Sequence, residues 1–333
     1  MTVAAVIGSG NWGTAYAAVL ADAGCTVRIA ARRDSIAAEI NDRHTNAGYL
    51  PQLRLPDTVS ATTSVAEALD GASIAVLAVP SQSLRDNLTV WRDLIPSDAA
   101  VVSLMKGIEL RTGKRMSEVI EEVAGIGHDR VVVVSGPNLA HEIAARQPAA
   151  AVVASSSARM RSRVAEACAT GYFRPYLGTD VIGTEIAGAT KNVIALAVGI
   201  AAGMGMGDNT MASLLTRGLA ETARLGTALG ADPQTFIGLA GVGDLVATCA
   251  SPLSRNRTFG YRLGTGMALE EVIAVTDQTA EGVKSCESIL QLARSVEVDV
   301  PIVENVAAVV HDGRSPRDVL EALMSRARKH EGA

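Results

Sequence analysis

A lysine lies inside a strongly apolar segment, GTEIAGATKNVIALAVGIAAGMGMG, which spans residues 183–207. Burying the ammonium group of Lys191 is unfavourable unless it is paired, hydrogen-bonded or neutralised. Three interpretations are open: a membrane span, a lysine that reaches along a core helix into water, and a lysine kept for proton transfer. The uninterrupted apolar stretch from Val193 to Met206 is shorter than the roughly 20 residues that a bilayer needs. A membrane span is therefore the weakest of the three.

A second lysine, Lys106, closes the predicted strand AVVSLMK, and the motif SGPN at residues 135–138 closes the next strand. Ligands of open parallel sheets bind beyond the carboxyl ends of the strands. Alone, Lys106 is equally consistent with an ordinary surface lysine. Together with Lys191 it indicates acid–base chemistry, because two ammonium groups near one substrate, or burial, make a proton easier to release near neutral pH.

Two further motifs offer an acid and a cluster of donors. Asp244 follows two glycines in GLAGVGDLVATC, where its simplest role is that of a helix N-cap. The motif SPLSRNRTFG places Ser254, Arg255, Asn256 and Arg257 at another predicted helix start. Such donors bind phosphate through guanidinium and backbone N–H groups, although a solvated helix face would have the same composition.

A glycine fingerprint follows the first predicted strand, in the order Gly8, Ser9, Gly10, Asn11, Trp12, Gly13. A strand that enters a helix through GxGxxG is typical of dinucleotide binding. Gly8 would permit the turn, Gly10 the approach of a pyrophosphate, and Gly13 close packing of the helix. The free N–H groups of the helix start would face the phosphates.

The end of the second predicted strand carries Arg32 and Arg33 where NAD-preferring sites usually have an acid. Two guanidinium groups favour the 2′-phosphate of NADPH, which is the first choice. One alternative is a solvated charged turn. Another is that Asp34 contacts the ribose hydroxyls, as in a site that prefers NADH.

Composition narrows the class of protein. The chain has 333 residues, a formal net charge of -5 and 3% aromatic residues, so nucleic acid is not an expected partner. Neither a disulfide framework nor a zinc cluster is indicated by the scattered cysteines, and HEIAA at His141 lacks the second histidine of a zincin helix, so no catalytic metal is expected. The sequence shows no export signal, which predicts a cytoplasmic protein. The cysteines are Cys25, Cys168, Cys249 and Cys286.

The elements that must position these residues fall into two parts. Apolar strand candidates alternate with helices at residues 3–7, 26–31, 74–80, 100–106, 131–137 and 150–155. This pattern predicts a parallel sheet covered on both faces. After residue 183 helical periodicity dominates. We therefore expect an α/β Rossmann-type, nucleotide-binding domain at residues 1–182 and an all-α substrate-binding domain at residues 183–333.

The chain resembles the bacterial-type NAD(P)-dependent glycerol-3-phosphate dehydrogenases. The motifs GSGNWGTA, KG, SGPN, KNVIA, TRGLAE, GVGDL, SRNR and AEGVKS occur in the order and at the spacing of that family, over nearly the whole chain. The resemblance implies reversible reduction of dihydroxyacetone phosphate to sn-glycerol 3-phosphate, supplying glycerophospholipid synthesis, with NADP preferred over NAD. It also implies a homodimer.

The resemblance assigns roles to individual residues. Lys191 would be the general acid/base, helped by Lys106, Asp244 and Asn192. Asn138 stands where Ser or Thr is common, so its hydrogen bonding is expected to differ. Substrate contacts would come from Lys106, Gly136, Asn138, Lys191, Asp244, Ser254, Arg255 and Asn256. Cofactor contacts would come from Gly8, Gly10, Asn11, Trp12, Gly13, Arg32, Arg33, Lys106, Ala140, Arg255, Thr279 and Glu281.

Two other functions would need only some of these residues. A two-domain dehydrogenase of hydroxy acids or ketopantoate would need a similar lysine on a helix but no phosphate-binding SRNR motif. A nucleotide-sensing protein without turnover would need only the glycine fingerprint and the arginines.

Overall fold

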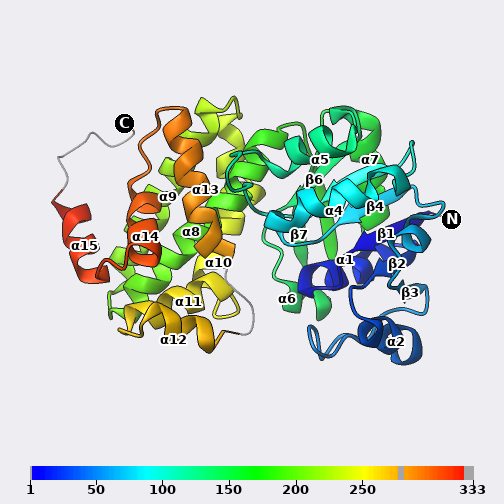
Figure 1. The fold of residues 1–333 in the computed structure, drawn as a ribbon, viewed down its shortest axis with the longest axis horizontal. Helices are drawn as coiled ribbons and strands as arrows, with labels where there is room; N and C mark the ends of the chain where they lie inside the picture. The colour runs from blue at the N-terminus through cyan, green and yellow to red at the C-terminus, as the bar shows by residue number, and fades with distance from the viewer. Residues whose placement is uncertain (1, 277–280, 326–333) are drawn as a thin grey trace. The chain divides into compact units, whose positions relative to one another are not determined.

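The computed structural model describes residues 2–276 and 281–325. The chain forms two compact units, one of Met1–Lys106 with Lys114–Glu185 and the other of Gly107–Gly113 with Ile186–Ala333. Figure 1 traces the elements of each unit along the chain. The first unit is α/β, and the longer elements of the second, within its described residues, are helices.

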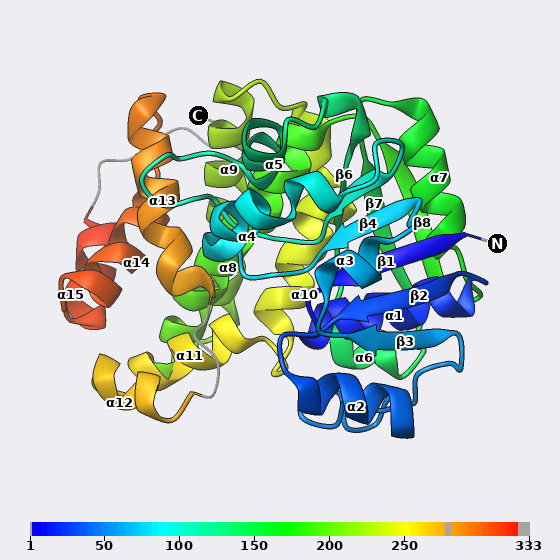
Figure 2. The same ribbon diagram turned by 45° about the vertical axis from the view of Figure 1, so that its right-hand side comes forward.

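The first unit contains one eight-stranded sheet in the order β3-β2-β1-β4-β5-β6-β7-β8, which Figure 2 shows from a second direction. All neighbouring strands are parallel except β6 and β7. The strands are β1 (Val3–Ile7), β2 (Thr26–Ala30), β3 (Val59–Thr62), β4 (Ile74–Leu77), β5 (Ala100–Ser103), β6 (Val131–Ser135), β7 (Ala149–Ala154) and β8 (Phe173–Gly178). The expected Rossmann-type unit is thus confirmed.

Three details of the sheet differ from the sequence-based expectation. The edge strands β3 (VSAT) and β8 (FRPYLG) were not among the predicted strands, because edge positions accept polar residues and proline. Strand β7 runs antiparallel to β6. The connection between them holds only the five-residue helix α6 (Ala140–Ala144), and the chain turns back instead of crossing over the sheet.

Helices cover both faces of the sheet, and each face has its own core. Besides α6, these helices are α1 (Asn11–Asp22), α2 (Asp34–Arg43), α3 (Val65–Leu69), α4 (Leu84–Trp91), α5 (Met116–Ala124) and α7 (Ala158–Cys168). In β1, Ala4 and Val6 join the core beneath α1, α2, α6 and α7, whereas Ala5 and Ile7 join the core beneath α3, α4 and α5. This alternation follows from the two-residue period of a strand.

The helical unit is built around α8 (Val181–Gly203), whose first turn still belongs to the first unit. This helix is long and apolar enough to cross a membrane, but 83% of its most apolar window is buried inside the protein, as in a core helix. The other helices of this unit are α9 (Asp208–Ala228), α10 (Asp244–Ala250), α11 (Arg255–Gly264), α12 (Leu269–Ala274), α13 (Glu281–Ser295), α14 (Pro301–His311) and α15 (Pro316–Met324), shown in Figure 1.

The glycines near the end of α8 allow α11 to approach its backbone. A Cβ atom at Gly199 would lie 2.1 Å from the carbonyl oxygen of Arg257, and one at Gly260 would lie 2.2 Å from the carbonyl oxygen of Leu196. Gly203 and Gly264 make equivalent contacts. These glycines therefore fix how α11 lies against α8, rather than marking a flexible segment.

A buried carboxylate joins α9 to α14 in the TRGLAE motif. Glu221 is only 2% exposed, and its two oxygens accept hydrogen bonds from the backbone N–H groups of Ile302 (2.9 Å) and Val303 (3.0 Å) at the start of α14. Burial raises the pKa of Glu221 to about 7, although these hydrogen bonds and Arg224 act in the opposite direction. The folded chain therefore holds a proton here that the unfolded chain releases at lower pH.

We expect the stability of the protein to fall as pH rises from 4.5 towards 7 because of Glu221. Its folded-state pKa lies above its ordinary value of 4.5, so its contribution is fully present below that value and is lost through about pH 7. Glu221→Gln removes the titrating group. The pH-dependent change in the free energy of unfolding that Glu221 causes, roughly 3 kcal/mol at most, should therefore disappear in this variant. The midpoint of thermal unfolding between pH 4.5 and 8 measures the effect. Glu287→Gln, at an exposed glutamate of α13, is the control. If the unfolding midpoint changed with pH by the same amount in both variants, Glu221 would not be the cause of this pH dependence.

Candidate functional site

The glycine-rich turn between β1 and α1 is fixed by close backbone contacts. Gly8 has φ +120°, and a Cβ atom there would lie 2.4 Å from the carbonyl oxygen of Ala78. A Cβ atom at Gly13 would lie 2.3 Å from the carbonyl oxygen of Gly8. Gly10 is the N-cap of α1 and has open space beside it. The turn therefore presents the first N–H groups of α1 to an open position, where a pyrophosphate fits.

Asn46 and Thr14 hold this turn from behind. The side-chain amide of Asn46 donates to the carbonyl oxygen of Ser9 and to the hydroxyl of Thr14, both at 2.9 Å. Thr14 Oγ1 in turn donates to the same carbonyl oxygen at 3.2 Å. Asn46 was not among the predicted site residues, because it lies in a loop after α2 and no local motif identifies it.

Asn11 and Trp12 have different surroundings. Asn11 Nδ2 lies 3.5 Å from Nε2 of His141, whose Nδ1 lies 3.2 Å from Nε2 of Gln52. The Trp12 ring packs against Tyr16 and Phe173, with ring centroids 5.4 and 6.5 Å away. The buried Trp12 Nε1 has no hydrogen-bond partner among the described residues. His141, at the start of α6 beside Ala140, is thus a neighbour of the fingerprint.

Arg32 and Arg33 lie between β2 and α2, and both are exposed. Arg33 is the N-cap residue of α2, and Asp34 is the first helical residue. Neither guanidinium group has a partner among the described residues. Both guanidinium groups are thus available to an anionic group beyond the end of β2. Asp34 is also exposed, so its carboxylate is available to ribose hydroxyls, which is the alternative contact.

Lys106 and the SGPN motif meet at the carboxyl ends of β5 and β6. Lys106 Nζ donates to the carbonyl oxygen of Gly136 at 3.0 Å. Gly136 has φ +143°, a conformation that favours glycine and turns the chain directly after β6. Asn138 follows, and neither Nδ2 nor Oδ1 of its buried amide has a hydrogen-bond partner among the described residues. An unsatisfied buried amide is unfavourable, so this position favours a ligand that offers both a donor and an acceptor.

Lys191 is held by two side chains of α10. Its Nζ donates to Asp244 Oδ1 and to Thr248 Oγ1, both at 2.7 Å. The side chain of Lys191 is 11% exposed and that of Asp244 is 2% exposed. The ammonium group in the apolar helix is thus paired and hydrogen-bonded, which removes most of the cost of burying it. Thr248 was not predicted, and its position one turn after Asp244 is the only sequence signal for it.

The turn before α10 determines where Asp244 lies. A π-helical turn over Leu239–Gly243 leads into α10, and a Cβ atom at Gly241 would lie 2.0 Å from the carbonyl oxygen of Phe236. Only glycine allows this approach. Asp244 is therefore the first residue of α10 and not its N-cap, and its carboxylate is directed to Lys191.

The SRNR motif forms the start of α11. Ser254 is the N-cap, and its hydroxyl accepts from the backbone N–H of Arg257 at 3.3 Å. Arg255 is exposed. Asn256 is 8% exposed, and its amide donates to Asn192 Oδ1 and accepts from the backbone N–H of Gly282, both at 2.9 Å. The helix start thus brings a guanidinium group and the first backbone N–H groups of α11 together.

The predicted site residues therefore gather in two sets. The first unit holds Gly8, Gly10, Asn11, Trp12, Gly13, Arg32, Arg33, Lys106, Gly136, Asn138 and Ala140, and the second holds Lys191, Asn192, Asp244, Ser254, Arg255, Asn256 and Glu281. Glu281 begins α13. Thr279 lies outside the described residues.

The cysteines take no part in this arrangement. All four are free thiols and are buried. Burial raises the pKa of Cys168 to about 11 and the pKa values of Cys249 and Cys286 to about 12, so these thiols stay protonated near neutral pH. Within the described residues, no three His, Cys, Asp or Glu side chains are grouped as metal ligands.

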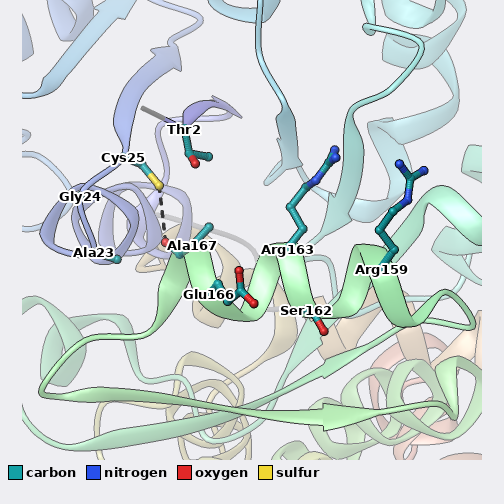
Figure 3. A pocket seen from close by; sticks show the side chains of 9 residues that line it. All are labelled: Thr2, Ala23, Gly24, Cys25, Arg159, Ser162, Arg163, Glu166 and Ala167. Carbon is teal, nitrogen blue, oxygen red and sulfur yellow. Dashed lines mark hydrogen bonds between the residues drawn. The ribbon is translucent and has the colours of Figure 1, made fainter.

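A separate pocket of about 410 Å³ lies at the amino ends of β1 and β2, away from the carboxyl ends of the strands where the predicted residues of this unit lie. Figure 3 shows Arg159 and Arg163 extending in one direction from α7, with Glu166 on the same helix. Arg163 already donates to the carbonyl oxygen of Asp98 at 2.8 Å. The pocket is open and mixed in charge, and it contains none of the predicted site residues.

A dinucleotide-binding α/β unit joined to a helical unit with a buried, paired lysine defines a two-domain dehydrogenase. Residues 3–161 match the family described as NAD-dependent glycerol-3-phosphate dehydrogenase N-terminus, and residues 180–321 match its C-terminus. The chain belongs to this family. It is 62% identical over 328 residues to the NAD(P)+ glycerol-3-phosphate dehydrogenase of Streptomyces griseus, covering 98% of each chain.

Other glycerol-3-phosphate dehydrogenases are also similar to the chain over nearly its full length. The corresponding Corynebacterium aurimucosum enzyme is 56% identical over 332 residues, covering 99% of this chain and all of the relative. The crystal structure of glycerol-3-phosphate dehydrogenase from Coxiella burnetii superposes with a TM-score of 0.92 at 33% identity, covering 98% of this chain and 99% of that one. A ketopantoate reductase from Ralstonia eutropha is 17% identical with a TM-score of 0.58 over 97% of this chain and 100% of that one, which shows a shared fold alone.

Proposed function

We propose that the protein reduces dihydroxyacetone phosphate to sn-glycerol 3-phosphate with NADPH or NADH, reversibly, and thereby supplies glycerophospholipid synthesis. Full-length identity to glycerol-3-phosphate dehydrogenases supports this activity. In the structure, the observation that carries it is the buried Lys191–Asp244–Thr248 cluster in the same unit as the SRNR helix start. A proton donor and an anion site in one unit suit a phosphorylated carbonyl substrate.

The residues of the first unit fit a dinucleotide. The open space beside Gly10 and the N-terminus of α1 would take the pyrophosphate, and Arg32 and Arg33 would take a 2′-phosphate. Bound NAD(P)H supplies the hydride that is transferred to the carbonyl carbon. Trp12 would act by packing, since its ring already contacts Tyr16 and Phe173.

Lys191 would deliver the proton that balances this hydride. Its ammonium group protonates the carbonyl oxygen as the C–H bond forms, giving the hydroxyl of sn-glycerol 3-phosphate. Asp244 and Thr248 hold Nζ by two hydrogen bonds, which leaves its third hydrogen for the substrate. Lys106 and Asn138 would also contact the substrate, as the family resemblance implies. Arg255 and the first N–H groups of α11 would hold its phosphate.

The wider organisation is part of the same proposal. Residues 1–182 would act as the nucleotide-binding domain and residues 183–333 as the substrate domain. We also propose a cytoplasmic homodimer. Exposed apolar side chains of the second unit, including Ile237, Val246 and Leu253, offer surface for self-association. Light scattering after size exclusion would detect it, and a monomer at micromolar concentration would contradict the dimer.

One assay tests the function against its rivals. NADPH absorbance is followed with dihydroxyacetone phosphate, with dihydroxyacetone, and with a 2-keto acid such as ketopantoate. We expect turnover with the first, far weaker turnover with the second, and none with the third. Preference for the keto acid would indicate a hydroxy-acid dehydrogenase, and nucleotide binding without turnover would indicate a sensor.

Arg255→Ala should mainly weaken substrate binding. A charge-assisted hydrogen bond contributes about 1.5–3 kcal/mol, and the exposure of Arg255 favours the lower end, so we expect KM for dihydroxyacetone phosphate to rise about 10-fold with little change in kcat. Inorganic phosphate should compete with substrate in the wild type and less in the variant. Arg294→Ala, at an exposed arginine of α13, is the control. An unchanged KM would put the phosphate site elsewhere.

A further inference from the structure

The carbonyl group of Ser9, in the glycine-rich turn, accepts two hydrogen bonds from behind the turn. Asn46 Nδ2 donates to it at 2.9 Å and Thr14 Oγ1 donates to it at 3.2 Å. Asn46 Nδ2 also donates to Thr14 Oγ1 at 2.9 Å, so the three groups form a closed ring. Ser9, Thr14 and Asn46 are 8%, 0% and 2% exposed. Because the ring is buried, losing a donor leaves the Ser9 carbonyl group without a full set of partners.

The Ser9 oxygen determines every donor in this ring, because it can only accept. Asn46 must present Nδ2 to it, since the other amide atom, Oδ1, is also an acceptor. The single hydroxyl hydrogen of Thr14 is used on the same oxygen, so Thr14 Oγ1 must accept from the second Nδ2 hydrogen. The ring thus needs a side chain with two donor hydrogens at position 46 and a hydroxyl group at position 14.

The position of Asn46 is fixed by its own loop. The backbone carbonyl oxygen of Asn46 accepts hydrogen bonds from the N–H groups of Tyr49 at 3.0 Å and Leu50 at 2.9 Å. Leu50 is fully buried in the same core as the apolar residues of α1. The packed loop therefore holds the amide of Asn46 against the turn.

Holding the Ser9 carbonyl group also sets the direction of the next N–H group. The peptide bond between Ser9 and Gly10 is trans and planar, so its N–H points opposite to its C=O. With the C=O turned back towards Asn46, the N–H of Gly10 points to the outer side of the turn. This N–H makes no hydrogen bond within residues 2–276 and 281–325. A Cβ atom at Gly10 would have nothing beyond its chain neighbours within 4 Å, so there is room for a phosphate beside it.

We infer that Asn46 is a positioning residue for the pyrophosphate of NADPH and NADH, an inference that rests on the proposed placement of this group beside Gly10. The Asn46 amide, together with Thr14, holds the Ser9–Gly10 peptide so that the Gly10 N–H donates to the pyrophosphate. The loop after α2 thereby determines how tightly the turn binds either cofactor. Asn46 Nδ2 does not contact the cofactor, since both of its hydrogens are engaged on the inner side of the turn.

Asn46→Leu tests this role, because leucine has a similar shape and no charge but lacks both donor hydrogens. We expect Kd for NADPH and Kd for NADH to rise alike, by about 5- to 150-fold, because a buried carbonyl group loses a donor. The kcat at saturating cofactor should stay near the wild-type value, because Lys191 and its partners are unchanged. Titration of the enzyme with each cofactor and steady-state kinetics measure the two effects. An unchanged Kd would overturn the inference.

A matched variant separates positioning from a general loss of stability. Asn41→Leu removes another side-chain amide that donates to a backbone carbonyl group, that of Ala61 at 2.8 Å, but this amide holds β3 and not the turn. We expect Asn41→Leu to unfold at a lower temperature and to keep wild-type affinity for both cofactors. If it lost as much affinity as Asn46→Leu, the Asn46 amide would only stabilise the unit.

Fragments of the cofactor locate the effect. ADP carries a pyrophosphate, whereas adenosine 2′-phosphate carries only the phosphate expected beside Arg32 and Arg33. In competition with NADPH, ADP should bind Asn46→Leu more weakly than it binds the wild type, and adenosine 2′-phosphate should bind both proteins equally. Equal weakening of the two fragments would contradict a role at the pyrophosphate.

Thr14 provides a second test if Asn46→Leu does not fold. Thr14→Val removes the hydroxyl group at nearly constant volume and should weaken binding of both cofactors, whereas Thr14→Ser keeps the hydroxyl group and should restore it. Equal affinities in these two variants would also overturn the inference. Binding is measured here without turnover. A wild type that binds NADPH but does not reduce dihydroxyacetone phosphate would therefore overturn the proposed function and not the role of Asn46.

Discussion

Lys191→Met is expected to lower kcat by about 100- to 10,000-fold while NADPH binding stays nearly unchanged. The substitution removes the proton donor but leaves the glycine-rich turn and the arginines of the first unit untouched. It also leaves Asp244 buried at 2% exposure without its cation, so stability should fall as well. Steady-state kinetics, NADPH titration and thermal unfolding together distinguish loss of chemistry from loss of fold.

Two further substitutions test whether the loss of kcat is due to the missing proton donor. Lys191→Arg keeps a cation beside Asp244 and Thr248 but cannot release a proton near neutral pH, so it should fold well and remain inactive. Lys114→Met removes an exposed lysine that pairs with Glu122 on the surface, and it should keep wild-type kcat. More than a tenth of wild-type kcat in Lys191→Met would mean that another group is the acid.

The double variant Arg32→Ala/Arg33→Ala should weaken NADPH binding about 10- to 150-fold and NADH binding far less. A 2′-phosphate beyond the end of β2 would form charge-assisted contacts of about 1.5–3 kcal/mol with these guanidinium groups. Both side chains are exposed, so added salt should reduce the difference. The measurement is kcat/KM for both cofactors at low and moderate ionic strength.

Asp34 provides the competing explanation for cofactor choice. If its carboxylate binds the ribose hydroxyls, the wild type will prefer NADH and Asp34→Ala will be the damaging change. Arg43→Ala removes an exposed cation from the last turn of α2 and controls for the general loss of positive charge. A wild type that prefers NADH would contradict our assignment of NADPH as the favoured cofactor.

Features that depend on neighbouring residues could be predicted from the sequence. The fingerprint of Gly8, Gly10 and Gly13 could be read because strand, turn and helix are contiguous, and the steric demand for glycine is local. The apolar strands of the sheet interior were likewise evident, because both of their faces are buried. The edge strands β3 and β8 were not, since one free edge relaxes that requirement.

Which side chains become partners depends on how the helices pack in the folded chain. Thr248 lies 57 positions from Lys191 in the chain, and nothing in the local sequence of either predicts their 2.7 Å hydrogen bond. Asn256 looked like one more donor at a helix start, yet the approach of α8 and α13 engages its amide between Asn192 and Gly282. The orientation of a buried amide depends on the donors and acceptors that packing brings to it. Those partners come from other helices, and the sequence of one helix does not specify them.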